Sequence, residues 1–166
     1  EPSTNDLDNL RKFAGKEKPE YIISAGGGGI IDLGKACAGL FNSKEKSEFY
    51  QLGGEITAKG IPFAAAPTTA GTGAEATKNG VFININENEK KSIRNDSFTS
   101  EIVILDPETL KHAPKNIIAF SGMDAFVQAA EAFFSKNAVW FTDMLSLKAF
   151  ELVSGNIESL YDKYTI

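Results

Sequence analysis

A run of four glycines at residues 26–29 follows the short apolar segment 21–25 and precedes a stretch of helical character. Bare glycine backbone lets N–H groups approach an anion closely, and the N-terminus of a helix adds partial positive charge. A tight turn between strand and helix is the simpler interpretation, but four consecutive glycines are more than such a turn needs. The sequence therefore favours a phosphate-binding turn here.

Two well-known phosphate motifs come close to this segment but do not fit it. Gly29 and Lys35 have the spacing of a Walker A loop, yet the next residue is Ala36, where a Ser or Thr hydroxyl should hold magnesium. Lys35 also falls inside the expected helix rather than at its start. The last position of a Rossmann GxGxxG pattern falls on Ile31 or Asp32, depending on which glycine is counted first. Both motifs are excluded as written.

A second turn, PTTAGTGAEATKN at residues 67–79, follows the apolar residues 63–66. The hydroxyls of Thr68, Thr69 and Thr72 suit the oxygens of a ribose or a phosphate. The alternative is a capped helix start, because Thr72 and Glu75 have the spacing of a capping box. Open parallel sheets bind ligands at the carboxyl ends of their strands, so two such turns, each after an apolar run, strengthen each other as a ligand site.

Polar side chains also recur at helical spacing in SGMDAFVQAAEAF, residues 121–133. Asp124, Gln128 and Glu131 stand at i, i+4 and i+7, which places them on one face of a helix. Polar groups on so apolar a helix often face a cleft. The alternative is that Asp124 caps the helix and the other two are solvated, and spacing alone favours this alternative.

The elements that must position these groups change in character along the chain. Strands are expected at residues 21–25, 62–66 and 102–105, all buried, and at 81–85 as an antiparallel or edge strand; helices are expected at 5–16, ending near Gly15, and at 30–41. After about Pro114 only helical patterns follow, at 125–134 and 141–160. We therefore expect an α/β nucleotide-binding domain with a mainly parallel sheet at 1–113, followed by the start of an all-helical domain at 114–166.

The composition excludes several kinds of site. The chain has 166 residues, with 42% hydrophobic and 23% charged residues and a net charge of -5, which argues weakly against nucleic-acid binding. Cys37 is the single cysteine and His112 the single histidine, which excludes an internal disulfide and a Cys- or His-rich metal site within these residues. With no run of about 18 apolar residues and no visible signal peptide, we expect no membrane contact and a cytoplasmic location. The chain begins with Glu1 rather than Met, so we expect a piece of a longer protein.

Five short motifs occur in order along most of the chain. They are the glycine run with Asp32 and Lys35, PTTAGTGAE at 67–75, the Asp-Pro pair at 106–107, GMDA at 122–125 and the Thr-Asp pair at 142–143. In this order and spacing they resemble the iron-containing (group III) alcohol dehydrogenase family. The resemblance implies the dehydroquinate synthase-like fold of that family, with an α/β nucleotide domain followed by a helical metal-binding domain.

The resemblance also implies a role for particular residues. It implies that the pyrophosphate of NAD or NADP is held by Gly27, Gly28 and Gly29, and that the same cofactor is lined by Thr68, Thr69, Thr72, Asn79 and Lys90. It implies that Asp124 and position 128 are the first two ligands of a divalent metal, iron or zinc, which makes Asp124 the expected catalytic-site residue.

Two positions depart from the family pattern. Gly29 stands where the family has Ser, which removes a hydroxyl and keeps the backbone, and Gln128 stands where the family has His. An amide oxygen ligates iron or zinc more weakly than imidazole does. The last two family ligands are histidines on later helices, so the 166-residue chain alone is expected to be inactive.

The expected function is that of a metal-dependent, NAD(P)-linked alcohol dehydrogenase or aldehyde reductase. It would transfer a hydride between the nicotinamide cofactor and a small alcohol or carbonyl substrate, and it would form a homo-oligomer as the family commonly does. Two alternatives remain open: a branch with altered or absent metal dependence that acts on a polar or sugar-like carbonyl, and a non-catalytic nucleotide-binding protein. The sequence does not distinguish NAD from NADP.

Overall fold

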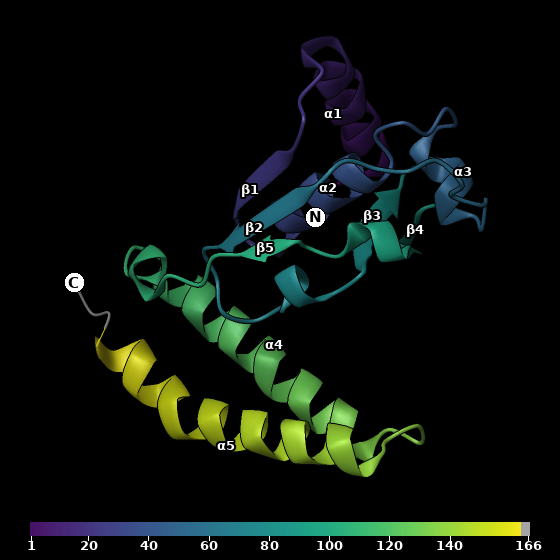
Figure 1. Ribbon diagram of the computed structural model, residues 1–166. Helices are drawn as coiled ribbons and strands as arrows, with labels where there is room; N and C mark the ends of the chain where they lie inside the picture. The colour runs from purple at the N-terminus through teal and green to yellow at the C-terminus, as the bar shows by residue number, and fades with distance from the viewer. Residues whose placement is uncertain (164–166) are drawn as a thin grey trace. The chain divides into compact units, whose positions relative to one another are not determined.

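The computed structural model describes residues 1–163 of the chain as two units (Figure 1). The first, which we call the sheet unit, comprises Glu1–Pro67 and Ala74–Asp106. The second, which we call the helical unit, comprises Thr68–Gly73 and the helices from Pro107 onward. Strands occur up to Val103, and the described residues from there on are helical or irregular, which confirms the expected change from strands to helices.

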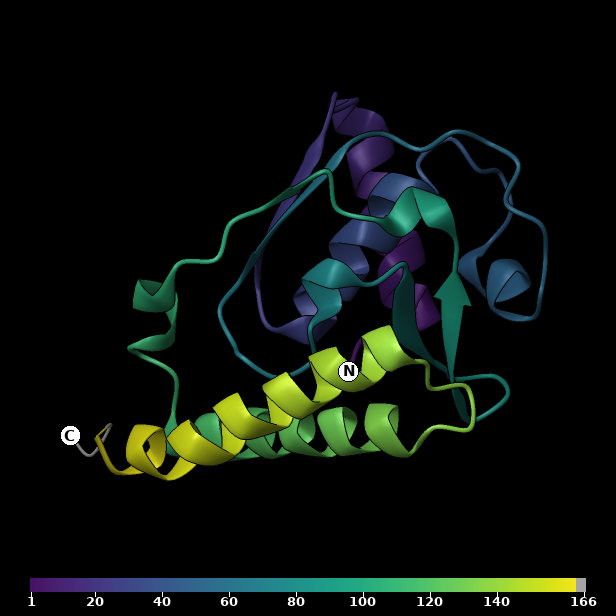
Figure 2. The ribbon, with the colours of Figure 1, turned by 60° about the horizontal axis from the view of Figure 1, so that its bottom comes forward.

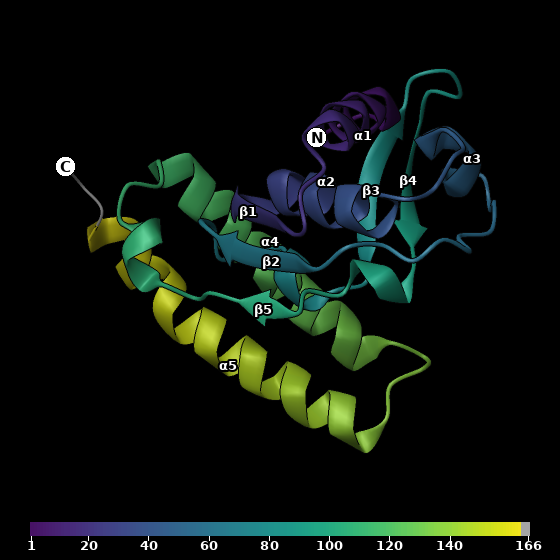
Figure 3. The ribbon, with the colours of Figure 1, turned by 45° about the horizontal axis from the view of Figure 1, so that its top comes forward.

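The sheet has three parallel strands in the order β1-β2-β5, namely β1 (Ile22–Gly26), β2 (Phe63–Pro67) and β5 (Ile102–Val103) (Figure 3). The expectation of a mainly parallel sheet is confirmed for the described residues. The expectation of buried strands is wrong for β1, in which only Ser24 is buried, and for the third strand, because β5 has only two residues and both are exposed. β5 is the edge strand and pairs with β2 alone, and an apolar run does not distinguish an edge strand from a central one.

The helix α2 (Gly28–Gly39) packs directly against β1 and β2. Its close approach depends on Gly34, where an added Cβ would lie 1.8 Å from the Ser24 Oγ and 2.9 Å from the Phe63 ring. The other side of α2 contributes Ala36 and Cys37 to a buried apolar cluster that also includes side chains from α1, β3 and β4. The sheet unit is therefore built around this one helix.

The first helix, α1 (Thr4–Glu17), begins with a capping box between Ser3 and Asp6. The hydrogen bonds from the Ser3 hydroxyl and N–H lower the pKa of the Asp6 carboxyl below its ordinary value. The expected helix at 5–16 is confirmed, and it continues through Gly15 to Glu17. The chain leaves the helix at Lys18, which has φ 50° and donates its N–H to the Ala14 carbonyl.

Two elements of the sheet unit have no counterpart among the expected ones. The first is the strand β4 (Glu89–Arg94), whose sequence EKKSIR carries no apolar run. It pairs in an antiparallel hairpin with β3 (Asn79–Asn84), a strand that the sequence predicts. The second is the helix α3 (Ser47–Gln51), which has only five residues and is too short for a periodic pattern. β4 and α3 form because of their partners in the fold rather than because of local apolar spacing.

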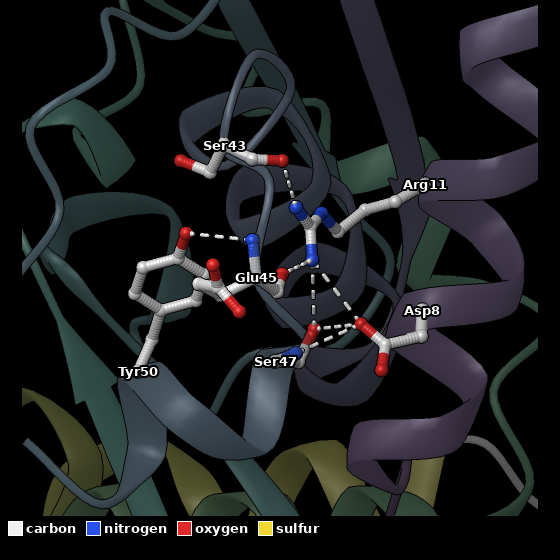
Figure 4. Close-up of polar contacts among 6 residues, drawn as sticks. All are labelled: Asp8, Arg11, Ser43, Glu45, Ser47 and Tyr50. Carbon is white, nitrogen blue, oxygen red and sulfur yellow. Dashed lines mark hydrogen bonds and ion pairs between the residues drawn. The ribbon is translucent and has the colours of Figure 1, made fainter. Parts of the chain in front are cut away.

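An arginine holds the segment before α3 against α1 (Figure 4). The Arg11 guanidinium lies 3.1 Å from the Asp8 carboxylate and donates to the backbone carbonyls of Ser43 and Glu45, at 2.6 Å and 2.9 Å. Asp8 in turn accepts the N–H and the hydroxyl of Ser47, at 2.9 Å and 2.6 Å. These bonds satisfy loop carbonyls that an apolar core could not, which fixes the chain between α2 and α3.

The helical unit consists mainly of two long helices, α4 (Lys115–Phe134) and α5 (Trp140–Lys163), which lie side by side (Figure 2). The Phe126 and Phe150 rings contact each other across the pair, with centroids 4.3 Å apart. The helices expected at 125–134 and 141–160 are confirmed, and α4 begins earlier than expected, directly after Pro114. Pro114 is the N-cap residue, and its carbonyl accepts the N–H groups of Ile117 and Ile118 at 2.9 Å and 3.0 Å.

One helix of the described part of the chain, α4, is long and apolar enough to cross a membrane by length and composition. This is weak evidence for a membrane span, because the core helix of a soluble protein passes the same test. The sequence expectation of no membrane contact therefore stays a prediction.

Candidate functional site

The glycine turn joins the end of β1 to the start of α2. Gly27 is the N-cap residue, with an extended backbone at φ -75° and ψ 179°, and its carbonyl accepts the N–H groups of Ile30 and Ile31 at 3.0 Å and 3.1 Å. The N–H groups of Gly28 and Gly29 precede these first bonds, so they lie in the part of the helix that has no intrahelical partners. This donor set, with the positive end of the helix dipole, fits a phosphate group.

The two turns begin at the same end of the sheet, where β1 and β2 reach their carboxyl ends. β1 and β2 are parallel and in register from Ile22 opposite Phe63 to Gly26 opposite Pro67. The glycine turn begins directly after Gly26 and the threonine turn directly after Pro67. The sequence expectation that each turn follows a strand at its carboxyl end is therefore confirmed, and the structure adds that the two strands are neighbours. The cofactor contacts of the individual residues stay predictions.

In the structure the threonine turn proper is Thr68–Gly73, which belongs to the helical unit. Its two glycines are required for different physical reasons. A Cβ at Gly71 would lie 2.5 Å from the Ser121 carbonyl of α4, so only glycine allows the turn to approach this helix so closely. Gly73 has φ +59°, a conformation that side chains disfavour. Thr68 and Thr69 are half-buried and Thr72 is exposed. The predicted helix start at Thr72 is a short 3-10 turn, Ala74–Ala76.

Two hollows of the helical unit lie beside this turn. Thr69 and Ala70 help to line an apolar cavity of about 210 Å³ between α4 and α5. Gly71 and Gln128 line an open hollow of about 410 Å³ with apolar and small residues of the same two helices. The threonine turn and a predicted metal residue therefore share one hollow, although Gly71 and Gln128 are 57 positions apart in the sequence.

Asp124 and Gln128 are neighbours on α4, as their spacing predicts. The Gln128 Nε2 donates a hydrogen bond of 2.7 Å to the Asp124 Oδ2, and both residues are exposed. A carboxylate and an amide oxygen are acceptable ligands for a divalent metal, so the pair fits part of a metal site. For both to ligate one ion, the amide must present its oxygen instead of its NH₂ group. Among residues 1–163, no group of three or more His, Cys, Asp and Glu side chains is close enough to hold a metal.

The other two predicted cofactor residues, Asn79 and Lys90, lie in the β3–β4 hairpin but are not brought together. Asn79 is opposite Arg94, whereas Lys90 is opposite Ile83, four residues farther along β3. At about 3.4 Å per residue this separates them by roughly 14 Å along the strand. The Lys90 ammonium is exposed and lies 2.5 Å from the Glu1 carboxylate. Their contacts with a cofactor stay predictions.

The sequence reasoning gave no role to the buried ion pair of α2. The Lys35 side chain is completely buried, and its Nζ lies 3.0 Å from the Asp32 Oδ1. Burial lowers the pKa of the Lys35 ammonium below its ordinary value, and the charge of Asp32 opposes this effect. The sequence does carry a signal for this ion pair: Asp32 and Lys35 are opposite charges at i and i+3 within the apolar stretch IIDLGKACAG. Charges on a buried helix need a partner, so this spacing predicts that the two side chains pair.

The chain is similar to known proteins over both units. The family described as iron-containing alcohol dehydrogenase matches residues 1–107, and the family described as the C-terminal part of Fe-containing alcohol dehydrogenases matches residues 118–165. The chain is 32% identical to a 4-hydroxybutyrate dehydrogenase of Clostridium kluyveri and 32% identical to a sulfoacetaldehyde reductase of Bilophila wadsworthia. These matches cover 98% and 97% of this chain, but only 43% and 42% of the relatives.

A solved structure is also similar to the chain. The sulfoacetaldehyde reductase from Bifidobacterium kashiwanohense, in complex with NAD+, is similar with a TM-score of 0.93 and 31% identity. The similarity covers 98% of this chain and 44% of that protein. This chain thus spans less than half the length of the relatives it matches.

Proposed function

The chain belongs to the iron-containing alcohol dehydrogenase family, and from this we propose that its protein transfers a hydride between NAD or NADP and an alcohol or aldehyde substrate. The observation that carries the proposal is the parallel register of β1 and β2. Because Gly26 lies opposite Pro67, the glycine turn and the threonine turn begin side by side at the carboxyl ends of these strands. One extended dinucleotide needs a phosphate site and a set of hydroxyls close together, and these two turns supply both.

The roles of the chain's own residues follow from their geometry. The N–H groups of Gly28 and Gly29 would bind the pyrophosphate, because they lie at the unpaired start of α2. Thr68 and Thr69 would offer hydroxyls to the rest of the cofactor, and Asp124 with Gln128 would supply two oxygen ligands to a metal ion. When bound, the nicotinamide accepts or gives the hydride and a divalent metal polarises the substrate oxygen.

The test is a spectrophotometric assay of the full-length protein at 340 nm. NAD and NADP are each offered with 4-hydroxybutyrate and with primary alcohols, and NADH and NADPH with sulfoacetaldehyde, a panel taken from the names of the relatives. We expect turnover with at least one cofactor and one substrate. Absence of turnover, together with absence of binding of either reduced cofactor, would contradict the proposal.

A second candidate rests on Gln128. The family pattern has histidine at this position, and an amide oxygen holds iron or zinc more weakly than imidazole does. The candidate is a member of the family with altered or absent metal dependence that reduces a polar carbonyl. Metal analysis of the purified full-length protein, together with its activity before and after treatment with a chelator, separates the two functions. Activity that survives complete metal removal would favour this second candidate.

Self-association and a cytoplasmic location complete the proposal. Self-association is an expectation from the family, whereas the cytoplasmic location is the expectation from composition and from the lack of a visible signal peptide. Neither depends on a particular residue of the site. Light scattering of the full-length protein tests the first, with a mass of two or more chains expected. Cell fractionation tests the second, with the protein expected in the soluble fraction.

A further inference from the structure

A buried lysine fixes the far end of the threonine turn to the helix that starts with the glycine turn. The Lys35 Nζ donates to the Ala74 carbonyl at 2.8 Å and contacts the Thr77 Oγ1 at 2.8 Å, in addition to its ion pair with Asp32. An ammonium group has three N–H donors, so these three partners satisfy it completely. Ala74 and Thr77 lie directly after the turn, Thr68–Gly73.

The partner of the lysine extends the same connection. The second carboxylate oxygen of Asp32, Oδ2, accepts the N–H of Val81 in β3 at 3.0 Å. The one ion pair therefore ties α2 to the residues after the threonine turn and to the hairpin that follows them. The near end of the turn is already fixed, because β2 is paired with β1 up to Pro67.

A buried ion pair is a weak source of stability, because the cost of removing two charges from water offsets much of their attraction. A fully satisfied buried polar network instead fixes one arrangement of the groups that it joins. Here the joined groups are the helix whose first residues form the glycine turn and the segment that ends the threonine turn. The network thus fixes the segment that directly follows the threonine turn to the helix that begins with the glycine turn.

We propose that Lys35, with Asp32, is a positioning residue: it holds the segment that follows the threonine turn against α2, the helix that begins with the glycine turn, and the binding of one nicotinamide dinucleotide requires this connection. It does not touch the cofactor, since its side chain is fully buried and all three donors have partners within the chain. This inference rests on the proposed function. It adds that affinity for the cofactor depends on a charge that the cofactor does not contact.

The experiment measures cofactor dissociation constants and amide hydrogen exchange in the full-length protein. Lys35→Met should raise the dissociation constant of the preferred reduced cofactor about tenfold, a change of about 1.4 kcal/mol. It should also increase exchange at residues 74–81 when no cofactor is present. Thr77→Val should also raise the dissociation constant and the exchange, but by less than Lys35→Met does. Thr77→Ser, which keeps the hydroxyl, should bind the cofactor like the wild type. Lys78→Met is the matched control, because the Lys78 side chain is exposed.

A double variant separates positioning from stability. Asp32→Asn combined with Lys35→Met leaves no buried charge and keeps an acceptor for the Val81 N–H. The double variant should therefore recover the melting temperature that Lys35→Met alone loses. It should still bind the cofactor about tenfold more weakly than the wild type, because the bonds to Ala74 and Thr77 are missing. Recovery of both properties would overturn the proposal, as would wild-type affinity in Lys35→Met. A wild-type protein that binds neither NADH nor NADPH would instead refute the proposed function itself, and this inference with it.

Discussion

Replacement of Gly34 by alanine tests whether the contact between α2 and the sheet positions the glycine turn. An alanine Cβ would lie 1.8 Å from the Ser24 Oγ, 3.0 Å from the Ser24 Cβ and 2.9 Å from the Phe63 ring. Rotation of the Ser24 hydroxyl relieves the first contact but not the other two, so the helix must move away from β1 and β2.

The size of the effect follows from two opposing terms. Overpacking a tight core costs about 1–3 kcal/mol, and three close atoms put this site near the upper end. Alanine gains about 1 kcal/mol over glycine inside a helix. We therefore expect Gly34→Ala to lower the free energy of unfolding by about 2 kcal/mol.

The matched control is Gly15→Ala in α1, where an added Cβ meets nothing within 4 Å. It should raise the free energy of unfolding by about 1 kcal/mol, because the gain in helix propensity is then unopposed. Adding Ser24→Ala to Gly34→Ala should recover part of the loss. Urea titration of the full-length variants, with the cofactor dissociation constant measured beside it, is the assay. If Gly34→Ala is as stabilising as Gly15→Ala and binds the cofactor normally, the contact does not position the turn.

Three further outcomes are expected in the full-length protein. Gly28→Val should weaken cofactor binding by tenfold or more in a fluorescence titration, because a branched side chain keeps phosphate from the backbone N–H groups; unchanged affinity would remove the phosphate role. Asp124→Ala should abolish bound iron or zinc in metal analysis and Gln128→His should raise it, since imidazole is the better ligand; no change in either variant would show that this face of α4 is not a metal site. Cys37 should resist iodoacetamide at pH 8 until urea unfolds the protein, because burial raises the pKa of its thiol to about 11 and leaves about one thiolate in a thousand; modification of the Cys37 peptide in the native protein, seen by mass spectrometry, would contradict this.

The parts of the fold that the sequence predicts are those with a strong local signal. The apolar runs before the glycine and threonine turns give β1 and β2, and the apolar spacing after Pro114 gives α4 and α5. The strand β4 could not be found in this way, since EKKSIR is a strand only because β3 pairs with it. The exposure of β5 likewise depends on which elements cover the sheet edge, and a short apolar run carries no information on that.

In the candidate site, too, the features with a local sequence signal were predictable and those that depend on long-range pairing were not. The glycine turn was predictable because its chemistry is that of the backbone, and Asp124 and Gln128 were predictable as neighbours because i and i+4 side chains meet on any helix. The separation of Asn79 from Lys90 depends on the register of the hairpin, which their sequence positions do not determine. The bonds from Lys35 to Ala74 and Thr77 join residues about 40 apart, and only the folded chain reveals them.

A crystal structure of the full-length protein with its preferred nicotinamide cofactor would show whether the two turns bind one cofactor molecule. We expect pyrophosphate oxygens to accept the N–H groups of Gly28 and Gly29 at about 2.7–3.2 Å, with Thr68 or Thr69 in contact with the same cofactor molecule. A dinucleotide bound away from the glycine turn, or bound there without contact to the threonine turn, would contradict this expectation.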